Sequence, residues 1–448
     1  MQTTVVGGNI LCARRSTTTL GAGGATATFV ALILLAAPSL ALSGAIWDQQ
    51  AKLEASDVAA FDQFGQSVAI DYDTAVVGSP FDDNANGANA GAAYVYDRDP
   101  VTGTWSQDAK LTASDGAPFD NFGYSVAISC DKILVGARND DDKGMDSGSA
   151  YVFVRDPVTG AWSQDAKLTA SDGAARDDFG RSVALDGDTA LVGAQRHDKS
   201  TLEFDTGAAY VFVQDSSTGT WSQQAELTAN DGADGDEFGH SVALDGGTAV
   251  IGARYADRGF MQNFGAAYVF VWCPETGDWQ QQAKLTPSNG AEFDDFGWSV
   301  GVSGDTAVVG APFHDASLTL DSTGSAYIFV RDPWLGVWTE QAELTASDEA
   351  GEQNFGWSVA IDGATVLVGA IGDNPASGSA YVFVRDCSTG TWFEQAKLVG
   401  SDGDVGDEFG FSVAVQGDTA IVGAPRHDQA LLTLDSGAAY VFVRITCC

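Results

Sequence analysis

Seven copies of one unit fill most of this chain. Each copy contains the dipeptide Phe-Gly, which recurs at Phe64, Phe122, Phe179, Phe238, Phe296, Phe355 and Phe409. A Trp stands 17 residues before each of these Phe residues, and successive copies lie 54 to 59 residues apart. Such a repeat predicts an array or a closed ring of one supersecondary unit. It argues against the two or three unrelated domains that a length of 448 residues would suggest.

Each unit is predicted to hold four β-strands. Phe122–Ile128 alternates large and small side chains with a period of two, which is typical of a strand with two different faces. Thr189–Ala194 is continuously apolar or small, as expected of a strand that is buried on both faces. Ala209–Val213 is a third strand, and Thr220–Leu227 is a fourth strand with one apolar and one polar face. Short turns rich in Asp and Gly join them.

The two ends of the repeat region predict how the units close. An isolated fourth strand lies at Ile46–Leu53, and the last unit stops after a third strand at Tyr440–Arg444. The N-terminal strand can therefore complete the last blade of a ring, which leaves no open sheet edge. We expect an all-β fold in which residues 45–444 form one seven-bladed β-propeller of four-stranded antiparallel blades. The alternative is an open solenoid, which would need polar capping repeats that are not seen in the sequence.

The repeated motifs resemble those of a known family. Phe-Gly is followed later in the unit by Gly-Ala-Pro at Gly310–Pro312 and Gly423–Pro425, and by Gly-Ser-Pro at Gly78–Pro80. Other copies have Gly-Ala and a different third residue, as at Gly136–Arg138. This unit resembles the FG-GAP repeat of integrin α-chain propellers, and the resemblance extends over the whole chain after residue 43. It implies a seven-bladed propeller, extracellular exposure and a binding role, without indicating a particular ligand.

The resemblance also raises the question of calcium. Integrin-type repeats that bind calcium carry an Asp-x-Asp-x-Asp-Gly loop between the first and second strands. This chain has short turns there, such as Asp71–Asp73 and Asp186–Asp188, which are too short to surround a hard divalent ion with oxygen ligands. We therefore expect the inherited calcium site to be absent and predict no definite cofactor. Weak Ca²⁺ binding by other loops is kept as a hypothesis.

Acidic residues recur at three positions of the unit that should share one face of the disc. In an antiparallel blade, the loops from fourth to first strand and from second to third strand open on the same face. Acids seven residues before the Phe form the first ring, acids two residues before it form the second, and acids just after the Gly-Ala strand form the third. The first ring comprises Asp57, Asp115, Asp172, Asp231, Asp348 and Asp402, the second Asp62, Asp120, Asp177, Asp236, Asp294 and Asp407, and the third Asp83, Asp141, Asp198, Asp257, Asp315 and Asp428.

Two interpretations of these rings remain open. Asp side chains accept hydrogen bonds from nearby backbone amides and so recur wherever a turn recurs. Alternatively, the carboxylates form a speculative binding face for divalent cations or for a basic or cation-bridged ligand. Repetition favours the first interpretation, because a specific site normally breaks the symmetry at one or two blades. The loops between second and third strands differ in every copy, and we expect them to carry specificity.

Residues 1–43 have the features of a secretory signal. They contain no Asp or Glu, carry Arg14 and Arg15, and end in an apolar run from Phe29 to Leu42. The run is shorter than the roughly 20 residues that span a bilayer, so we expect a secreted, extracellular protein with no membrane span after signal removal. The net charge of −39 disfavours nucleic acids and anionic membranes as partners.

Five cysteines follow the signal, two of them in a short tail at residues 445–448. An odd number leaves one thiol for an intermolecular bond, and the spacing does not suggest a metal cluster. Their pairing is not determined by the sequence, although Cys387 lies on the blade beside the C-terminus and could bond to a tail cysteine. The five are Cys130, Cys273, Cys387, Cys447 and Cys448.

The sequence contains no recognised catalytic motif. There is no nucleophile elbow, phosphate-binding loop or zinc-protease signature. Three histidines share one repeat position on alternate blades, too far apart to bind one metal ion together, and all four are interpreted as surface loop residues. The blades look nearly identical close to the axis, which disfavours an active site there. The histidines are His197, His240, His314 and His427.

These features together predict a monomeric, secreted, non-enzymatic binding or adhesion module. Its ligand would be an extracellular protein or a carbohydrate, recognised through the acidic loop face. One alternative is an extracellular polysaccharide lyase or hydrolase, since the chain is rich in carboxylates that could act in pairs. Another is a purely structural cell-wall or matrix protein.

Overall fold

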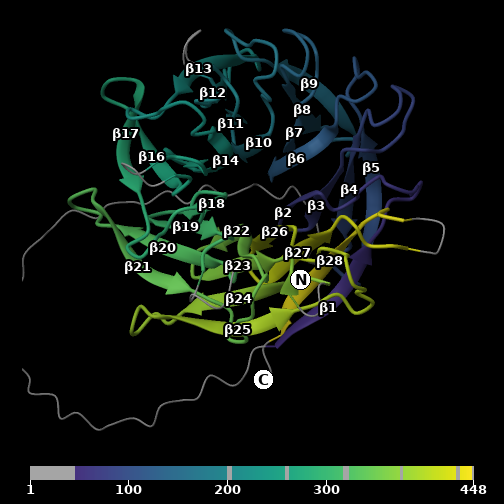
Figure 1. Cartoon of the computed structure of the whole chain (residues 1–448). Coiled ribbons are helices and arrows are strands. Elements are labelled where there is room, and N and C mark those ends of the chain that lie inside the picture. The colour runs from purple at the N-terminus through teal and green to yellow at the C-terminus, as the bar shows by residue number, and fades with distance from the viewer. Residues whose placement is uncertain are drawn as a thin grey trace, which may run out of the picture. The chain divides into compact units, whose positions relative to one another are not determined.

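The computed structural model describes residues 46–198, 204–257, 262–315, 322–373, 377–429 and 434–445. Ala45–Cys448 forms one compact unit. Its strands form seven four-stranded antiparallel sheets that are arranged as blades around a central axis (Figure 1). The predicted all-β, seven-bladed propeller is therefore confirmed.

Each blade runs in chain order from an inner strand at the axis to an outer strand at the rim. Blades 1 and 2 consist of β2 (Ser67–Asp71), β3 (Thr74–Ser79), β4 (Ala92–Arg98) and β5 (Trp105–Leu111), then β6 (Phe122–Ser129), β7 (Lys132–Ala137), β8 (Ser149–Arg155) and β9 (Trp162–Leu168). Blades 3 and 4 consist of β10 (Ser182–Asp186), β11 (Thr189–Ala194), β12 (Ala208–Gln214) and β13 (Trp221–Leu227), then β14 (Phe238–Asp245), β15 (Thr248–Ala253), β16 (Ala266–Cys273) and β17 (Asp278–Leu285).

The remaining blades repeat this pattern. Blades 5 and 6 consist of β18 (Ser299–Ser303), β19 (Thr306–Ala311), β20 (Ser325–Arg331) and β21 (Trp338–Leu344), then β22 (Phe355–Asp362), β23 (Thr365–Ala370), β24 (Ser379–Arg385) and β25 (Trp392–Leu398). Blade 7 consists of β26 (Ser412–Gln416), β27 (Thr419–Ala424), β28 (Ala438–Ile445) and, as its outer strand, β1 (Ile46–Leu53).

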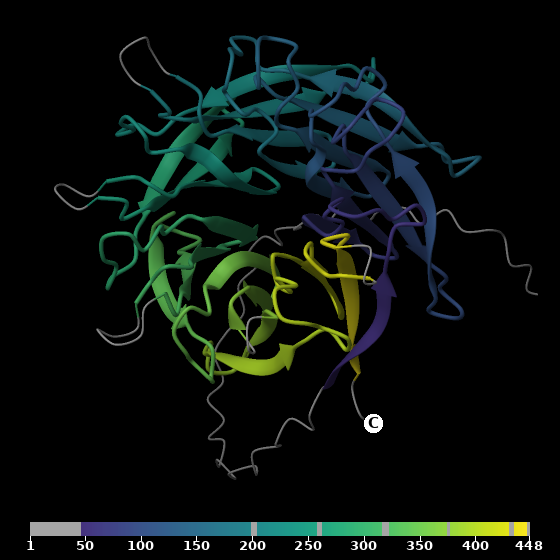
Figure 2. The same cartoon turned by 45° about the vertical axis from the view of Figure 1, so that its right-hand side comes forward.

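Blade 7 is completed by the N-terminal strand, as predicted. β1 pairs antiparallel with β28, from Ile46 opposite Ile445 to Leu53 opposite Ala439. Figure 2 shows these two strands side by side, in purple and yellow. A parallel bridge between Phe64 and Gly437 also joins blade 1 to blade 7. The ring is closed, so the open solenoid is excluded.

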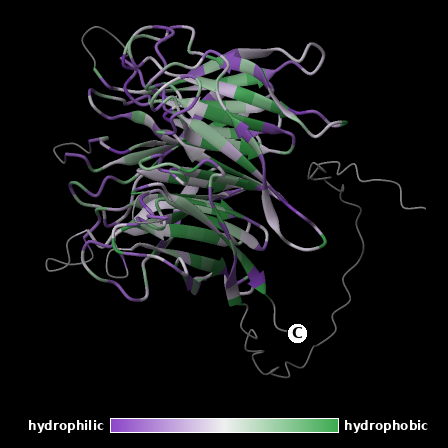
Figure 3. Ribbon diagram, turned by 90° about the vertical axis from the view of Figure 1, so that its right-hand side faces the viewer, coloured by the Kyte–Doolittle hydropathy of each residue, from purple (hydrophilic) through white to green (hydrophobic). Residues whose placement is uncertain are grey.

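The hydrophobic core lies between neighbouring blades. One cluster joins Val76, Val95 and Leu111 of blade 1 to Phe122 and Tyr151 of blade 2. The Phe122 and Tyr151 rings meet edge to face, with centroids 5.5 Å apart. Figure 3 shows mostly hydrophobic strands and mostly hydrophilic loops. Because each cluster draws on two blades, no blade can bury its apolar faces alone.

The inner strand contains an irregularity that the sequence pattern did not predict. In blade 2 the register between β6 and β7 shifts between Phe122 and Ser125, and Gly123 has a φ of +92°. Phe122 is buried in the core between blades, whereas Tyr124 lines the central channel. The continuous alternation predicted for this strand is therefore wrong at its start. The bulge turns Tyr124 toward the axis, and blades 4 and 6 show the same shift.

Two rings of hydrogen bonds fasten each blade to the next. The Ser two positions after the Phe-Gly glycine donates a hydrogen bond to the carbonyl of the equivalent glycine in the next blade, as from Ser67 to Gly123 at 2.9 Å. The last bond of this ring, from Ser412 to Gly65 at 2.8 Å, crosses the closure. At the other end of the channel, Asp186 accepts a hydrogen bond from the Gly246 amide of the next blade at 2.7 Å. The short turns between the first and second strands, which were compared with calcium-binding loops, therefore link neighbouring blades.

Candidate functional site

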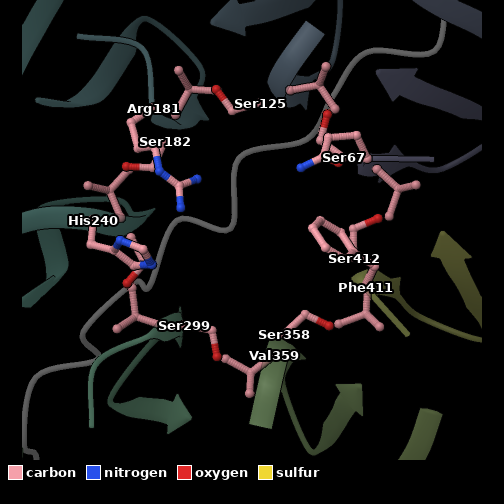
Figure 4. A pocket seen from close by; sticks show the side chains of 18 of the residues that line it. Ser67, Ser125, Arg181, Ser182, His240, Ser299, Ser358, Val359, Phe411 and Ser412 are labelled. Carbon is pink, nitrogen blue, oxygen red and sulfur yellow. The ribbon is translucent and has the colours of Figure 1, made fainter. Parts of the chain in front are cut away.

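A cavity of about 280 Å³ lies in the central channel. Its lining includes one variable position of the repeat, the residue between Phe-Gly and Ser (Figure 4). The Ser and Val residues that follow this position are the same in all seven blades. The expectation of nearly identical blades at the axis is therefore wrong. The variable position holds Gln66, Tyr124, Arg181, His240, Trp298, Trp357 and Phe411.

Blades 5 to 7 supply an aromatic side to the cavity. The Trp298 and Trp357 rings have centroids 4.6 Å apart, with an angle of 48° between their planes. Phe411 lies 5.7 Å from Trp357, and Phe313 meets Trp298 edge to face at 5.4 Å. All four side chains belong to half-buried residues. Trp298, Trp357 and Phe411 line the cavity and offer apolar ring surface to a ligand, while Phe313 packs against Trp298.

Blades 2 to 4 bring three arginines to the other side of the channel, of which Arg181 lines the cavity. Arg138 and Arg254 replace the Pro of Gly-Ala-Pro, and Arg181 occupies the variable position. The guanidinium groups of Arg138 and Arg181 lie 4.0 and 4.9 Å from the centroid of the Tyr124 ring. Arg254 is paired with Glu237 at 2.7 Å. The Nε atoms of Arg138 and Arg181 are buried and make no hydrogen bond with any residue that the structure describes.

The charges of these arginines act on one another and on the neighbouring His240. Burial lowers the pKa of Arg181, and the charges of Arg138 and Arg254 lower it further. Burial, together with the charges of Arg181 and Arg254, holds the pKa of His240 well below its ordinary value, so its imidazole is neutral at pH 7. His240 Nδ1 lies 2.8 Å from Oε1 of Gln195. An anion in the cavity would offset the repulsion among the arginines.

The second ring of acids lies beneath the loops and stabilises turns. Each carboxylate accepts a hydrogen bond from the amide three residues earlier, as Asp62 does from Ala59 at 2.8 Å. Gln353 takes the same role in blade 6. The turn interpretation accounts for this ring. Its members are 2–5% exposed, namely Asp62, Asp120, Asp177, Asp236, Asp294 and Asp407.

The third ring also serves the backbone. Asp83 accepts a hydrogen bond from the Asn89 amide at 2.7 Å, within the loop between β3 and β4. Residues 199–203, 258–261, 316–321, 374–376 and 430–433 of these variable loops lie outside the described residues, so their role in specificity stays a prediction. The same kind of bond is made by Asp141, Asp198, Asp257, Asp315 and Asp428.

The first ring is partnered mainly by lysines of the outer strands. Asp57 accepts hydrogen bonds from Lys110 at 2.7 Å and from the Tyr94 hydroxyl at 2.9 Å. Burial acts to raise the pKa of Asp57, but these two hydrogen bonds bring it below its ordinary value. In blade 3, the outer strand near Asp172 carries Glu226 in place of the lysine. Lysines pair in the same way with Asp115, Asp231, Asp348 and Asp402.

The four histidines are buried, so their interpretation as surface residues is wrong. They are only 4–7% exposed. The position after the second strand folds beneath the loops, where Nδ1 of three imidazoles lies 2.7–3.0 Å from a second-ring carboxylate. The sequence feature that could have indicated this arrangement is a His that recurs at one position of the repeat, between two Asp-rich segments. The pairs are His197 with Asp177, His314 with Asp294 and His427 with Asp407.

The buried second ring predicts a pH-dependent stability. Burial raises the pKa of Asp120 to about 6, above its ordinary value of 3.8. The folded state therefore binds this proton more tightly than the unfolded state, and the stabilisation is lost as pH rises through about 6. We expect Asp120→Asn, which keeps an acceptor for the Ala117 amide, to be more stable than the parent at pH 7 by up to about 3 kcal/mol. Urea denaturation should show the difference vanishing near pH 4.

A matched variant in the same blade should behave in the opposite way. Burial acts to raise the pKa of Asp115, but the hydrogen bond and charge of Lys167 bring it below its ordinary value. Asp115→Asn should therefore lose stability at pH 7, by no more than about 1 kcal/mol because the pair is partly exposed. A loss of stability in Asp120→Asn at pH 7 would contradict the assignment of the raised pKa.

The structure contradicts the predicted disulfide between Cys387 and a tail cysteine. Cys387 is an exposed free thiol, so its bond to Cys447 or Cys448 is not formed. Cys273 is also free, and Cys130 is disulfide-bonded. Cys447 and Cys448 lie outside the described residues. An intermolecular disulfide stays a prediction.

The closed ring of seven blades, with its axial cavity and Phe-Gly motif, defines a repeat β-propeller. The family model of the FG-GAP repeat matches seven segments of the chain, at residues 47–96, 105–153, 162–212, 221–270, 279–329, 338–383 and 392–442. The chain therefore belongs to the FG-GAP repeat family, as its resemblance to integrin-type propellers indicated.

Further comparisons add little about function. No curated protein sequence matches this chain. A protein from Lactobacillus plantarum, solved as a crystal structure, is 15% identical, with a TM-score of 0.48 over 76% of this chain and 86% of that chain. A similarity at that level carries no argument about function. In the parts of the chain that the structure describes, no helix has the length and apolarity required to cross a membrane.

Proposed function

We propose that this protein is a secreted, monomeric, non-enzymatic binding module that holds an acidic carbohydrate in its axial cavity. One observation carries the proposal. A motif that is otherwise constant in seven blades places Arg181 on one side of the cavity and the rings of Trp298, Trp357 and Phe411 on the other. Guanidinium groups bind carboxylate or sulfate groups in bidentate fashion, while the apolar face of a sugar ring packs against indole. Secretion rests on residues 1–43, which lie outside the described residues.

The size of the cavity limits what can enter. Its 280 Å³ is just below the range of about 300–1,000 Å³ that is usual for small-molecule sites. A single acidic sugar unit at a chain end fits this volume better than a chain interior. The proposal puts the ligand at the axis and not on the acidic loop face, and it is supported by the engagement of the loop acids with lysines and amides.

The lining also favours binding over hydrolysis. No carboxylate is present among the described residues that line the cavity. Most glycoside hydrolases need a pair of carboxylic groups at the scissile bond. His240, the one titratable imidazole in the lining, is held neutral and buried beside arginines. This supports recognition as the role of the site, with polysaccharide hydrolysis as the rival activity.

Removing Arg181 should abolish most of the affinity. We expect Arg181→Ala to weaken binding of a hexuronic acid or a sulfated monosaccharide by about 10- to 100-fold, since hydrogen bonds to a charged group contribute about 1.5–3 kcal/mol. Isothermal titration calorimetry at two salt concentrations measures this loss. The affinity of the parent should fall as salt rises, because the attraction is partly electrostatic.

The control removes an arginine far from the cavity. Arg444 lies on β28 and pairs with the exposed Asp418, so Arg444→Ala should bind like the parent. Equal affinity for a neutral hexose would contradict the proposed charge recognition. Binding of acidic peptides but not acidic sugars would assign the cavity to a protein ligand. Turnover of a polysaccharide by the parent protein would establish the rival enzymatic activity.

A further inference from the structure

We propose that blade 3 binds one zinc-class divalent metal ion between His197, Asp172 and Glu226. One ligand atom of each residue lies within 4.8 Å of the others. His197 Nε2 is 3.8 Å from Asp172 Oδ2 and 3.9 Å from Glu226 Oε1. Zinc bonds of about 2.0–2.2 Å in tetrahedral geometry place neighbouring ligand atoms about 3.3–3.6 Å apart. The two carboxylates are 43% and 38% exposed, and ion binding would draw both closer to Nε2.

The His197 ring is already oriented for this role. Its Nδ1 lies 3.0 Å from Oδ2 of Asp177, which in turn accepts a hydrogen bond from the Ala174 amide at 2.9 Å. Asp177 is only 2% exposed. With Nδ1–H donating to this buried carboxylate, the lone pair of Nε2 faces the two acids. A carboxylate behind a ligating imidazole is the usual arrangement of protein metal sites, because it fixes both tautomer and orientation.

Tyr210 lies beneath the three proposed ligands. It is completely buried, and its ring meets the His197 ring edge to face at 6.0 Å. Burial raises the pKa of Tyr210, and the charges of Asp172 and Glu226 and a hydrogen bond to Asp172 raise it further. The equivalent contact in blade 1, between Tyr94 and Asp57, has a length of 2.9 Å. The Tyr–Asp contact therefore belongs to the repeat, and the combination of His197 with Glu226 is what distinguishes blade 3.

The site is specific to one blade. Blade 7 also has a histidine at this position, but Nζ of Lys52 lies 2.9 Å from Nε2 of His427 and so occupies the place of the ion. In blade 5, His314 lies 3.6 Å from Glu343, but Asn289 replaces the first-ring acid. Of the described residues, one set of three therefore meets the geometry. This break of symmetry is what distinguishes a specific site from a repeated turn.

The donor set selects the class of ion. One imidazole nitrogen and two carboxylate oxygens suit zinc and related transition metals, and the fourth tetrahedral position is left for water. Calcium prefers six to eight oxygen ligands. The ion would tie the loop of Asp172, the outer strand of Glu226 and the segment after β11 together on the loop face. This site is separate from the axial cavity and does not depend on the ligand proposed there.

The experiment counts bound ions in three forms of the full-length protein. Isothermal titration calorimetry with zinc should give one ion per chain in the parent. Glu226→Lys copies the arrangement of blade 7 and should give none at the same concentrations. Asn289→Asp supplies the missing acid in blade 5 and should give two. Glu226 is exposed, and unchanged urea denaturation without zinc verifies that the variants are folded.

Cobalt substitution identifies the ligands. Cobalt at this site should show d–d absorption of a four- or five-coordinate ion without a sulfur-to-metal charge-transfer band, which Cys273 or Cys387 would produce. The proposal is overturned if the parent binds no zinc, if Glu226→Lys leaves the stoichiometry unchanged, if the sulfur band appears, or if calcium binds in preference to zinc. Failure of sugar binding in Arg181→Ala would not alter any of these outcomes.

Discussion

Gly123→Ala is expected to lower the free energy of unfolding by at least about 4 kcal/mol, a size reserved for steric overlap or strain in a core. Gly123 has a φ of +92°, and an added Cβ would lie 2.1 Å from the carbonyl oxygen of Ala92 in blade 1. That oxygen belongs to strand β4 and cannot move without disturbing the sheet. Urea denaturation should show the loss as a lower midpoint.

Gly187→Ala distinguishes a loss of stability that comes from steric overlap from one that comes from backbone strain. Gly187 has a φ of +57°, but nothing lies within 4 Å of an added Cβ. This variant should lose only the cost of a left-handed residue, about 1–2 kcal/mol. Equal midpoints for the two variants would show that close approach of the Phe-Gly segment to the preceding blade does not stabilise the ring.

Lys110→Met is expected to cost about 3–5 kcal/mol, because it leaves a buried carboxylate without its cation. Asp82 is 2% exposed, and Lys110 Nζ lies 2.9 Å from its Oδ2. The Tyr94 hydroxyl donates to the same oxygen at 2.7 Å but brings no positive charge. Methionine retains much of the apolar stem, so the measured loss in urea denaturation at pH 7 reports mainly the charge.

Blade 4 provides the matched control. Lys284 occupies the equivalent position, but its partner Asp231 is 53% exposed and Ala256 stands in place of the buried acid. Lys284→Met should therefore lose no more than about 1 kcal/mol. Adding Asp82→Asn to Lys110→Met should restore most of the stability. Similar losses in blades 1 and 4 would refute the role assigned to the buried ion pair.

The polar residues beneath the loop face vary as sets. Where the position after the second strand is an acid, as at Asp82, the outer strand carries a lysine. Where it is His197 or His314, the outer strand carries Glu226 or Glu343, whereas His427 in blade 7 faces Lys52. The pairing became visible only once the two positions were known to face each other, since they lie about half a repeat apart in the chain.

Several elements followed directly from the sequence. The continuous apolar run of β11 predicted a strand buried on both faces, and its residues from Ala190 to Ala194 are buried. In β13 the predicted polar side, which includes Ser222 and Glu226, is exposed. The spare strand at Ile46–Leu53 predicted the closure with β28. These inferences succeeded because periodicity, turn residues and strand count are properties of the chain itself.

Other features could not be derived in this way. The shift at Gly123 reverses the alternation of the inner strand, so that the variable residue and not the Phe faces the axis. The histidines looked like surface residues because nothing local shows that a loop position folds under the neighbouring turn. The acidic composition likewise gave no indication that three arginines cluster on blades 2 to 4.

The sequence by itself determined the blade, the number of blades and the closure, because each depends on patterns within some 60 residues and on their repetition. Only the tertiary structure decided which acids are buried, which are paired and which meet His197, and which side chains converge on the axis. Those outcomes depend on contacts between blades, where a bulge or a shared carbonyl sets the direction of a side chain. The physical reason is that the core of this protein lies between repeats and not within them.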